Sequence, residues 1–136
     1  MVSGSPVKIL LVEDEPPLLQ LIEKYLQRLG FEVETHLKSF DALRNFEAEP
    51  DRYDLVIADL GMPDMPGDTL LTRMLEIRPD LRVLVCSGSP FFIENLPRSL
   101  QRQVAFLQKP FVPKMLAEAV QNLLKERAGN SPEASR

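Results

Sequence analysis

Apolar residues recur along the chain in short uninterrupted runs, separated by longer segments that mix apolar and polar residues. A run without polar alternation is typical of a parallel strand that is buried on both faces of its sheet. Such runs predict strands at residues 8–12, 31–35, 55–58, 83–86 and 104–107, the second being the weakest. The pattern therefore predicts five strands.

The segments between these runs place apolar residues three and four positions apart, which is the period of a helix with one buried face. They predict helices over residues 16–29, 40–46, 70–77 and 113–124. Two prolines suit the first turn of the first helix, Gly30 suits its end, and Ser39 is the expected N-cap of the second. Between residues 90 and 103, Pro97 interrupts a weak pattern, which predicts at most a short or irregular helix.

Strands that alternate with helices predict an α/β domain, in which a parallel sheet is covered by helices on both faces. The 136 residues, 44% hydrophobic and 26% charged, match one globular domain. We expect this domain over residues 7–127. The polar segments 1–6 and 128–136 are interpreted as flexible tails or linker remnants.

Charge, hydropathy and cysteine content argue against several classes of function. The net charge is −4 and the basic residues are scattered, which argues against direct nucleic-acid binding. No segment has the length of a membrane span or the pattern of a signal peptide, so we expect a cytoplasmic domain without membrane contact. The single cysteine, Cys86, lies inside an apolar run and is interpreted as a buried small hydrophobic residue.

Chemically active residues stand where the predicted strands end, and the carboxyl ends of parallel strands are where such sheets bind ligands. Glu13 and Asp14 follow the first strand, and Asp59, Ser87 and Lys109 end or follow the third, fourth and fifth. Carboxylates without a histidine or cysteine at ligand spacing favour Mg²⁺. A lysine and a hydroxyl opposite them could hold a phosphoryl group, so the set predicts phosphoryl transfer.

Other polar residues near these ends have structural interpretations. Asp64, between two prolines, is interpreted as a turn residue, and Asp68 as a charge at a helix start. His36 ends the second strand but has no partner at ligand spacing, so it is a poor metal ligand. Glu13 and Asp14 alone could cap a helix. The set of acids, serine and lysine at four of the five strand ends is what favours a functional site.

Four motifs resemble the receiver domain of two-component response regulators over about residues 8–124. They are Leu-Val-Glu-Asp-Glu at 11–15, Asp-Leu-Gly-Met-Pro at 59–63 with Gly67, Val-Cys-Ser-Gly at 85–88, and Phe-Leu-Gln-Lys-Pro-Phe at 106–111. The resemblance implies a flavodoxin-like sheet of order 2-1-3-4-5. In wording, Ser-Gly-Ser-Pro at 87–90 and the motif at 106–111 are most similar to the C-terminal receivers of hybrid histidine kinases.

The resemblance also implies a role for each acidic residue. Asp59 would accept a phosphoryl group from the phosphohistidine of a histidine kinase. Asp14, Asp59 and the backbone carbonyl of Gly61 would bind Mg²⁺, and Glu13 would act on the ion through water. The chain would then be a signalling phosphoacceptor that phosphorylates and dephosphorylates itself with Mg²⁺, and not an enzyme for external substrates.

The remaining implied roles belong to the response to phosphorylation. Lys109 would pair with phosphoryl oxygens, in a Lys109–Pro110 peptide that is commonly cis in the family, and Ser87 would donate a hydrogen bond to them. Phe106 would be the aromatic switch that turns inward. Gly61 and Ser89 match positions that tune dephosphorylation; both are small and uncharged, so we hypothesise an open path for water to the acyl phosphate.

Two features depart from the family pattern. Position 106 is Phe where many members carry Tyr, so no hydroxyl is present there, and the segment 89–103 lacks the familiar fourth-helix pattern. The expected partners are a histidine kinase, a phosphotransfer domain or other domains of the same hybrid kinase.

Two alternatives stay open beside the phosphoacceptor. A Mg²⁺-dependent phosphohydrolase of similar fold would need a second acid two residues after Asp59, where the chain has Gly61. A pseudo-receiver that only docks partners would not need the intact set of acids, serine and lysine.

Overall fold

Five parallel strands form one sheet in the order β2-β1-β3-β4-β5 in the computed structural model, which describes residues 6–91 and 93–128. They are β1 (Lys8–Val12), β2 (Glu32–His36), β3 (Leu55–Asp59), β4 (Val83–Ser87) and β5 (Val104–Gln108). The predicted strands and their order are confirmed: β1 has the predicted ends, β2 lies one residue later, and the other three strands are one residue longer. Apart from Pro6 and Ala128, the predicted tails lie outside the described residues.

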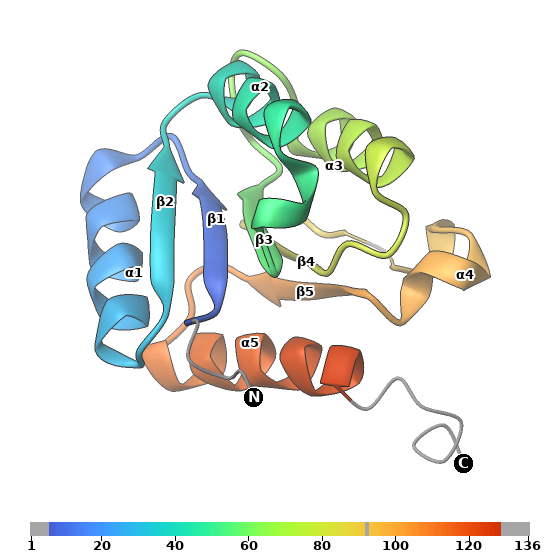
Figure 1. Cartoon of the computed structure of the whole chain (residues 1–136). Coiled ribbons are helices and arrows are strands. Elements are labelled where there is room, and N and C mark those ends of the chain that lie inside the picture. Colours follow the sequence, from blue (N-terminus) through green and yellow to red (C-terminus); the bar gives the residue numbers. More distant parts are fainter. Residues whose placement is uncertain (1–5, 92, 129–136) are drawn as a thin grey trace.

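Helices cover both faces of this sheet (Figure 1). They are α1 (Pro16–Arg28), α2 (Ser39–Ala48), α3 (Gly67–Ile77), α4 (Arg98–Gln101) and α5 (Pro113–Ala128), with short 3-10 turns η1 (Pro50–Arg52) and η2 (Ile93–Asn95). Helices α1 and α5 pack on one face and α2 and α3 on the other. None of the described helices is long and apolar enough to cross a membrane.

The strands contribute to two cores because successive side chains point to opposite faces. On β1, Leu10 lies in the cluster under α2 and α3, whereas Ile9 and Leu11 lie in the cluster under α1 and α5. On β3, Val56 and Ile57 divide in the same way. A strand with both faces covered needs apolar residues at every position, which is why the sequence shows runs and not alternation.

The helix ends follow the sequence cues at α1 and differ at α2. Helix α1 begins at Pro16 and its end is followed by Gly30, whose positive φ of 97° favours glycine. Ser39 was the predicted N-cap of α2, and this is wrong: Lys38 is the N-cap and the Ser39 hydroxyl donates to the Met65 carbonyl instead. The first amides of α2 are bonded by Asp64, so this residue does more than shape a turn.

The segment after β4 contains little helix, as its sequence predicts. Helix α4 has four residues and begins directly after Pro97, which is its N-cap. Among the described residues between β4 and α4, the chain forms the turn η2. The fourth helix is therefore short.

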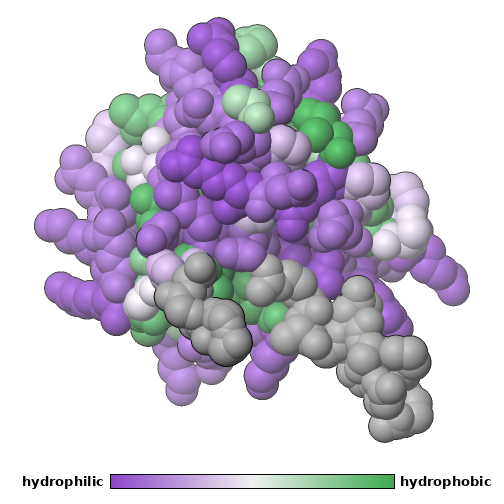
Figure 2. Space-filling model, in the orientation of Figure 1, coloured by the Kyte–Doolittle hydropathy of each residue, from purple (hydrophilic) through white to green (hydrophobic). Residues whose placement is uncertain are grey.

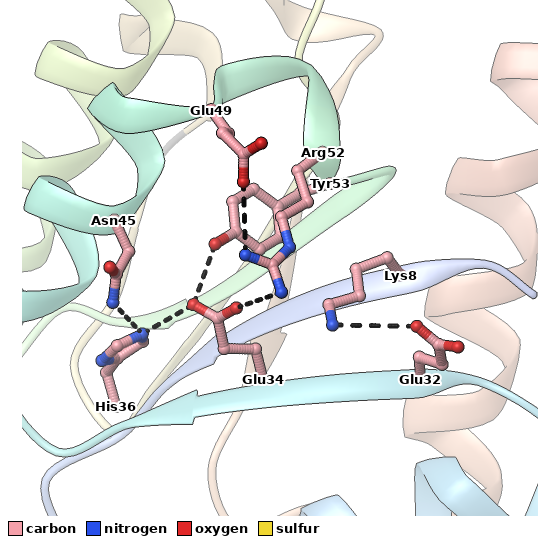
Figure 3. Close-up of polar contacts among 8 residues, drawn as sticks. All are labelled: Lys8, Glu32, Glu34, His36, Asn45, Glu49, Arg52 and Tyr53. Carbon is pink, nitrogen blue, oxygen red and sulfur yellow. Dashed lines mark hydrogen bonds and ion pairs between the residues drawn. The ribbon is translucent and has the colours of Figure 1, made fainter.

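A polar network braces the edge strand β2 against the chain that leads into β3 (Figure 3). The Glu34 carboxylate accepts a hydrogen bond from the Tyr53 hydroxyl at 2.8 Å and lies 2.9 Å from His36 Nε2. Arg52 adds an ion pair at 3.6 Å. His36 therefore contacts Glu34 and, through the same nitrogen, Asn45, so it serves the fold at this edge.

Burial would raise the pKa of Glu34, but the hydrogen bonds from His36 and Tyr53 lower it below its usual value of 4.5. Burial and the neighbouring Glu34 raise the pKa of Tyr53, so its hydroxyl stays protonated and donates. Because the folded-state pKa of Glu34 is lowered, its stabilisation is full above pH 4.5 and is lost as the pH falls through the folded-state value.

We expect Tyr53→Phe to lower the free energy of unfolding by about 1–2 kcal/mol at neutral pH, because it removes a hydrogen bond to a charged group. The deficit should shrink as the pH falls below 4.5 and Glu34 is protonated. Urea unfolding across this range measures both effects. Tyr25→Phe, on a tyrosine of α1 packed against the other core, is the matched control. A deficit that stays constant with pH would contradict the role of the Glu34 charge.

Candidate functional site

Three carboxylates meet where β1 and β3 end. Asp59 is the last residue of β3, and Glu13 and Asp14 follow β1 directly. One oxygen atom from each of these side chains lies within 4.8 Å of the others. Glu13 and Asp59 are buried and Asp14 is half-buried. The structure thus brings the predicted acidic residues together at one edge of the sheet.

Lys109 faces this cluster from the end of β5. Its Nζ lies 2.9 Å from Glu13 Oε1 and 3.4 Å from Asp59 Oδ2. Its backbone amide donates to the carbonyl of Ser87 at 2.8 Å, and the peptide to Pro110 is cis, as the resemblance implied. The direct pair with Glu13 was not predicted, because it joins residues far apart in the sequence.

The electrostatics of the cluster favour a bound cation. Burial raises the pKa of Glu13, with the hydrogen bond and charge of Lys109 acting in the opposite direction. Burial would lower the pKa of Lys109, but Glu13 and Asp59 outweigh it and raise that pKa, so the lysine is an ammonium. One ammonium against three carboxylates leaves an excess of negative charge when all are ionised.

The donor set fits Mg²⁺. Its side chains offer only oxygen, and this hard ion takes one or two carboxylates and keeps waters that a phosphate can replace. The Gly61 amide donates to Asp59 Oδ1 at 3.2 Å, and a Cβ at this glycine would lie 3.9 Å from both carboxylate oxygens. A side chain at position 61 would therefore contact the Asp59 carboxylate. The roles of the Gly61 carbonyl and of Glu13 toward the ion stay predictions.

Ser87, Ser89 and Phe106, which are also predicted to respond to phosphorylation, lie at the end of β4, just after it, and on β5. Ser87, 3% exposed, accepts a bond from the amide of Ser89 at 3.1 Å. Phe106 is half-buried on β5 and its ring packs against Phe91, with centroids 6.1 Å apart. Phe91 was missed because it lies in the segment of weak pattern. The switch roles of Ser87 and Phe106 and the lifetime role of Ser89 stay predictions.

Cys86 has no part in this chemistry. It is buried at the end of β4, and burial raises the pKa of its thiol to about 12. A thiol of that pKa is not a thiolate at neutral pH and is a poor nucleophile or metal ligand. The interpretation of Cys86 as a small hydrophobic residue is therefore confirmed.

An apolar groove of about 390 Å³ opens beside Lys109, between α1 and the start of α5. Its lining includes Leu18, Leu21, Tyr25, Phe111 and Leu116, and Glu15 and Lys109 also line it. Leu21 is 64% exposed, more than the other large hydrophobic residues of the core helices. The view in Figure 2 is mainly hydrophilic, with small apolar patches scattered over it, some of them on the α1 side of the molecule.

The doubly wound sheet of order 2-1-3-4-5, with acids and a lysine at its strand ends, is the arrangement expected of two-component signalling domains. The sequence profile of the response regulator receiver domain matches residues 9–121. The chain belongs to this family.

Individual relatives carry the same assignment. The chain is 35% identical to the sensor kinase CckA of Brucella abortus over 127 residues, 92% of this chain and 13% of that protein. It is 29% identical to the response regulator receiver protein CpdR of the same organism, covering 86% of this chain and 96% of that protein. The chain thus spans a small part of CckA and almost all of CpdR.

A solved structure agrees with these sequence relatives. The receiver domain of the hybrid histidine kinase CckA superimposes with a TM-score of 0.71 at 33% identity, covering 85% of this chain and 98% of that one. The predicted resemblance to receivers of two-component systems, including those of hybrid kinases, is confirmed.

Proposed function

We propose that this receiver domain accepts a phosphoryl group on Asp59 from the phosphohistidine of a histidine kinase or phosphotransfer domain. The observation that carries the proposal is the setting of the Asp59 carboxylate. One oxygen is held by the Gly61 amide, and the other faces the Lys109 ammonium across 3.4 Å. Glu13 and Asp14 complete an acidic cluster around it.

The transfer replaces one bond to phosphorus by another. An Asp59 oxygen attacks the phosphorus, the bond from phosphorus to the histidine nitrogen breaks, and that nitrogen leaves with the electron pair and takes up a proton. Lys109 neutralises charge on the phosphoryl oxygens. Asp14, Asp59 and the Gly61 carbonyl would hold Mg²⁺, which supplies further charge neutralisation during the transfer.

The signal then passes through Ser87 and Phe106. A phosphoryl group adds about −1.5 to −2 charge and three acceptor oxygens. The Ser87 hydroxyl exchanges its contact with the Ser89 amide for a phosphoryl oxygen. Its movement leaves space for Phe106 to turn inward, away from Phe91. We place this relay in the cytoplasm, where its kinase partners present their phosphohistidines.

Intact-mass spectrometry after incubation with acetyl phosphate tests the proposal. With Mg²⁺ the chain should gain the mass of one phosphoryl group, and with excess chelator it should gain none. Steady release of phosphate without a modified chain would instead support the phosphohydrolase. A chain that is never modified, by this donor or by a phosphorylated phosphotransfer domain, would support the docking module.

We further propose that the phosphodonor lays a helix along the groove between α1 and α5. A phosphohistidine must come within bonding distance of Asp59, and this groove is apolar and shares Lys109 with the site. Leu21 is exposed, so a partner helix that covers it would remove apolar surface from water.

Leu21→Asp should therefore slow phosphotransfer from a phosphorylated histidine phosphotransfer domain by about tenfold or more, since about 1.4 kcal/mol of lost contact corresponds to that factor. Uptake from acetyl phosphate should stay unchanged, because that donor needs no helix contact. Leu37→Asp, a 46% exposed leucine before α2, is the matched control. Equal slowing with both donors, or by both substitutions, would refute this docking surface.

A further inference from the structure

Three hydrogen bonds tie the loop between β3 and α3 to the start of α2. Asp64 Oδ1 accepts from the amide of Ser39 at 3.1 Å, and Oδ2 accepts from the amide of Phe40 at 3.0 Å. In the opposite direction, the Ser39 hydroxyl donates to the carbonyl of Met65 at 2.9 Å. We call these bonds the α2 clasp.

Breaking the hydrogen bonds of the α2 clasp would be energetically costly. Ser39 is fully buried and Met65 is 6% exposed, so breaking their bond would leave polar groups without a partner away from water. Burial would raise the pKa of Asp64, but the amides of Phe40 and Ser39 lower it. Asp64 is therefore a carboxylate at neutral pH, and it satisfies two of the four free amides at the helix start.

The clasped loop is the one that serves the phosphoacceptor. It begins after Asp59, and its second residue, Gly61, donates to the Asp59 carboxylate. Gly67, at its far end, donates its amide to the Leu60 carbonyl at 2.9 Å. Between these two ends, Pro63 and Pro66 are exposed, so the α2 clasp supplies the polar anchor of the loop's outer half.

We propose that Asp64 and Ser39 are positioning residues, which hold the loop so that Gly61 presents its amide to Asp59 and its carbonyl toward Mg²⁺. The effect of the Gly61 position on phosphoryl transfer rests on the proposed function. The restraint that Asp64 and Ser39 place on the loop does not depend on that function. A distortion of α2 would reach the loop through these three bonds, which join it to the start of α2.

The first test uses the protein without metal. Asp64→Ala should speed amide hydrogen exchange at Gly67 by about tenfold, because the loop opens more often when its outer anchor is gone. Asp64→Asn keeps one acceptor oxygen and should give an intermediate rate. Asp41→Ala removes an exposed carboxylate from the first turn of the same helix and should leave the rate at Gly67 unchanged.

The second test is the dissociation constant for Mg²⁺, measured by calorimetry. Asp64→Ala should raise it about three- to tenfold, and Ser39→Ala should raise it less, because Ser39→Ala removes one of the three bonds. Asp41→Ala should leave it unchanged. Slowed phosphoryl uptake from acetyl phosphate in Asp64→Ala that is recovered at high Mg²⁺ would support the same role.

A clasp that only caps α2 gives a different result. Asp64→Ala would then lower the melting temperature, while the exchange rate at Gly67 and the Mg²⁺ dissociation constant stay at the wild-type values, and the proposal would be overturned. A wild-type chain that takes up no phosphoryl group would refute the proposed function alone. The exchange rate at Gly67 would still decide whether Asp64 restrains the loop.

Discussion

Asp59→Asn is expected to abolish phosphoryl uptake from acetyl phosphate, with no modified chain detectable by intact-mass spectrometry. The amide has nearly the size of the carboxylate but is neutral and a poor nucleophile, so no acyl phosphate forms. The change also removes one of three neighbouring negative charges, and Lys109 keeps its 2.9 Å pair with Glu13. The variant should therefore fold at least as stably as the wild type.

Mg²⁺ should bind this variant about tenfold or more weakly, a loss of about 1.4 kcal/mol, because a charged ligand becomes neutral. Asp68→Asn is the matched control: Asp68 is exposed in the first turn of α3 and should leave uptake unchanged. Continued modification of the Asp59→Asn chain would place the acceptor on another residue. Lost uptake in both variants would point to a general effect of charge on this side of the sheet.

The sequence predicts most of the fold because each strand shows its own signal within a few consecutive residues. The runs around Ile9, Ile57 and Leu84 are short and almost entirely apolar, as a strand covered on both faces requires. The strand ends then bring Asp14, Asp59 and Lys109 to one edge by topology, without knowledge of any distance. This is why the acidic cluster could be predicted before the structure was known.

What the sequence could not predict are contacts between residues that are far apart in the chain. Asp64 has the local surroundings of a turn residue, and nothing near it indicates that its partners are the amides of Ser39 and Phe40. The wrong prediction that Ser39 is an N-cap has the same origin. Serine before an apolar helix favours an N-cap, but the Ser39 hydroxyl donates to the carbonyl of Met65 in another loop. Phe91 follows a proline and shows no period, so its packing on Phe106 left no signal in the pattern.

Gly67 shows how a local residue choice can be dictated by a distant backbone. A Cβ at this position would lie 2.3 Å from the carbonyl oxygen of Asp59 and 2.6 Å from the Cα of Leu60. Its φ is not positive, so the requirement is close approach and not backbone freedom. The start of α3 therefore packs directly on the backbone of Asp59, the proposed phosphoacceptor, and glycine is what allows that distance.

We expect Gly67→Ala to lower the free energy of unfolding by about 1–3 kcal/mol, because the three nearest atoms that the new methyl meets all belong to the backbone and cannot rotate away. Urea unfolding measures this loss. Gly88→Ala is the control for stability, since a Cβ there meets nothing within 4 Å. If Gly67→Ala unfolds at the same urea concentration as Gly88→Ala, the close approach does not limit the fold.

The same substitution should also slow phosphoryl uptake, for a reason separate from stability. To admit the methyl group, either α3 moves away or the backbone at Asp59 shifts, and the second response displaces the acceptor from Lys109 and from the Gly61 amide. Reactions lose rate steeply when a reacting group is misplaced by about 1 Å. Slow uptake by a fully folded Gly67→Ala chain would show that Asp59 has moved. Normal uptake by a destabilised chain would show that α3 has moved instead.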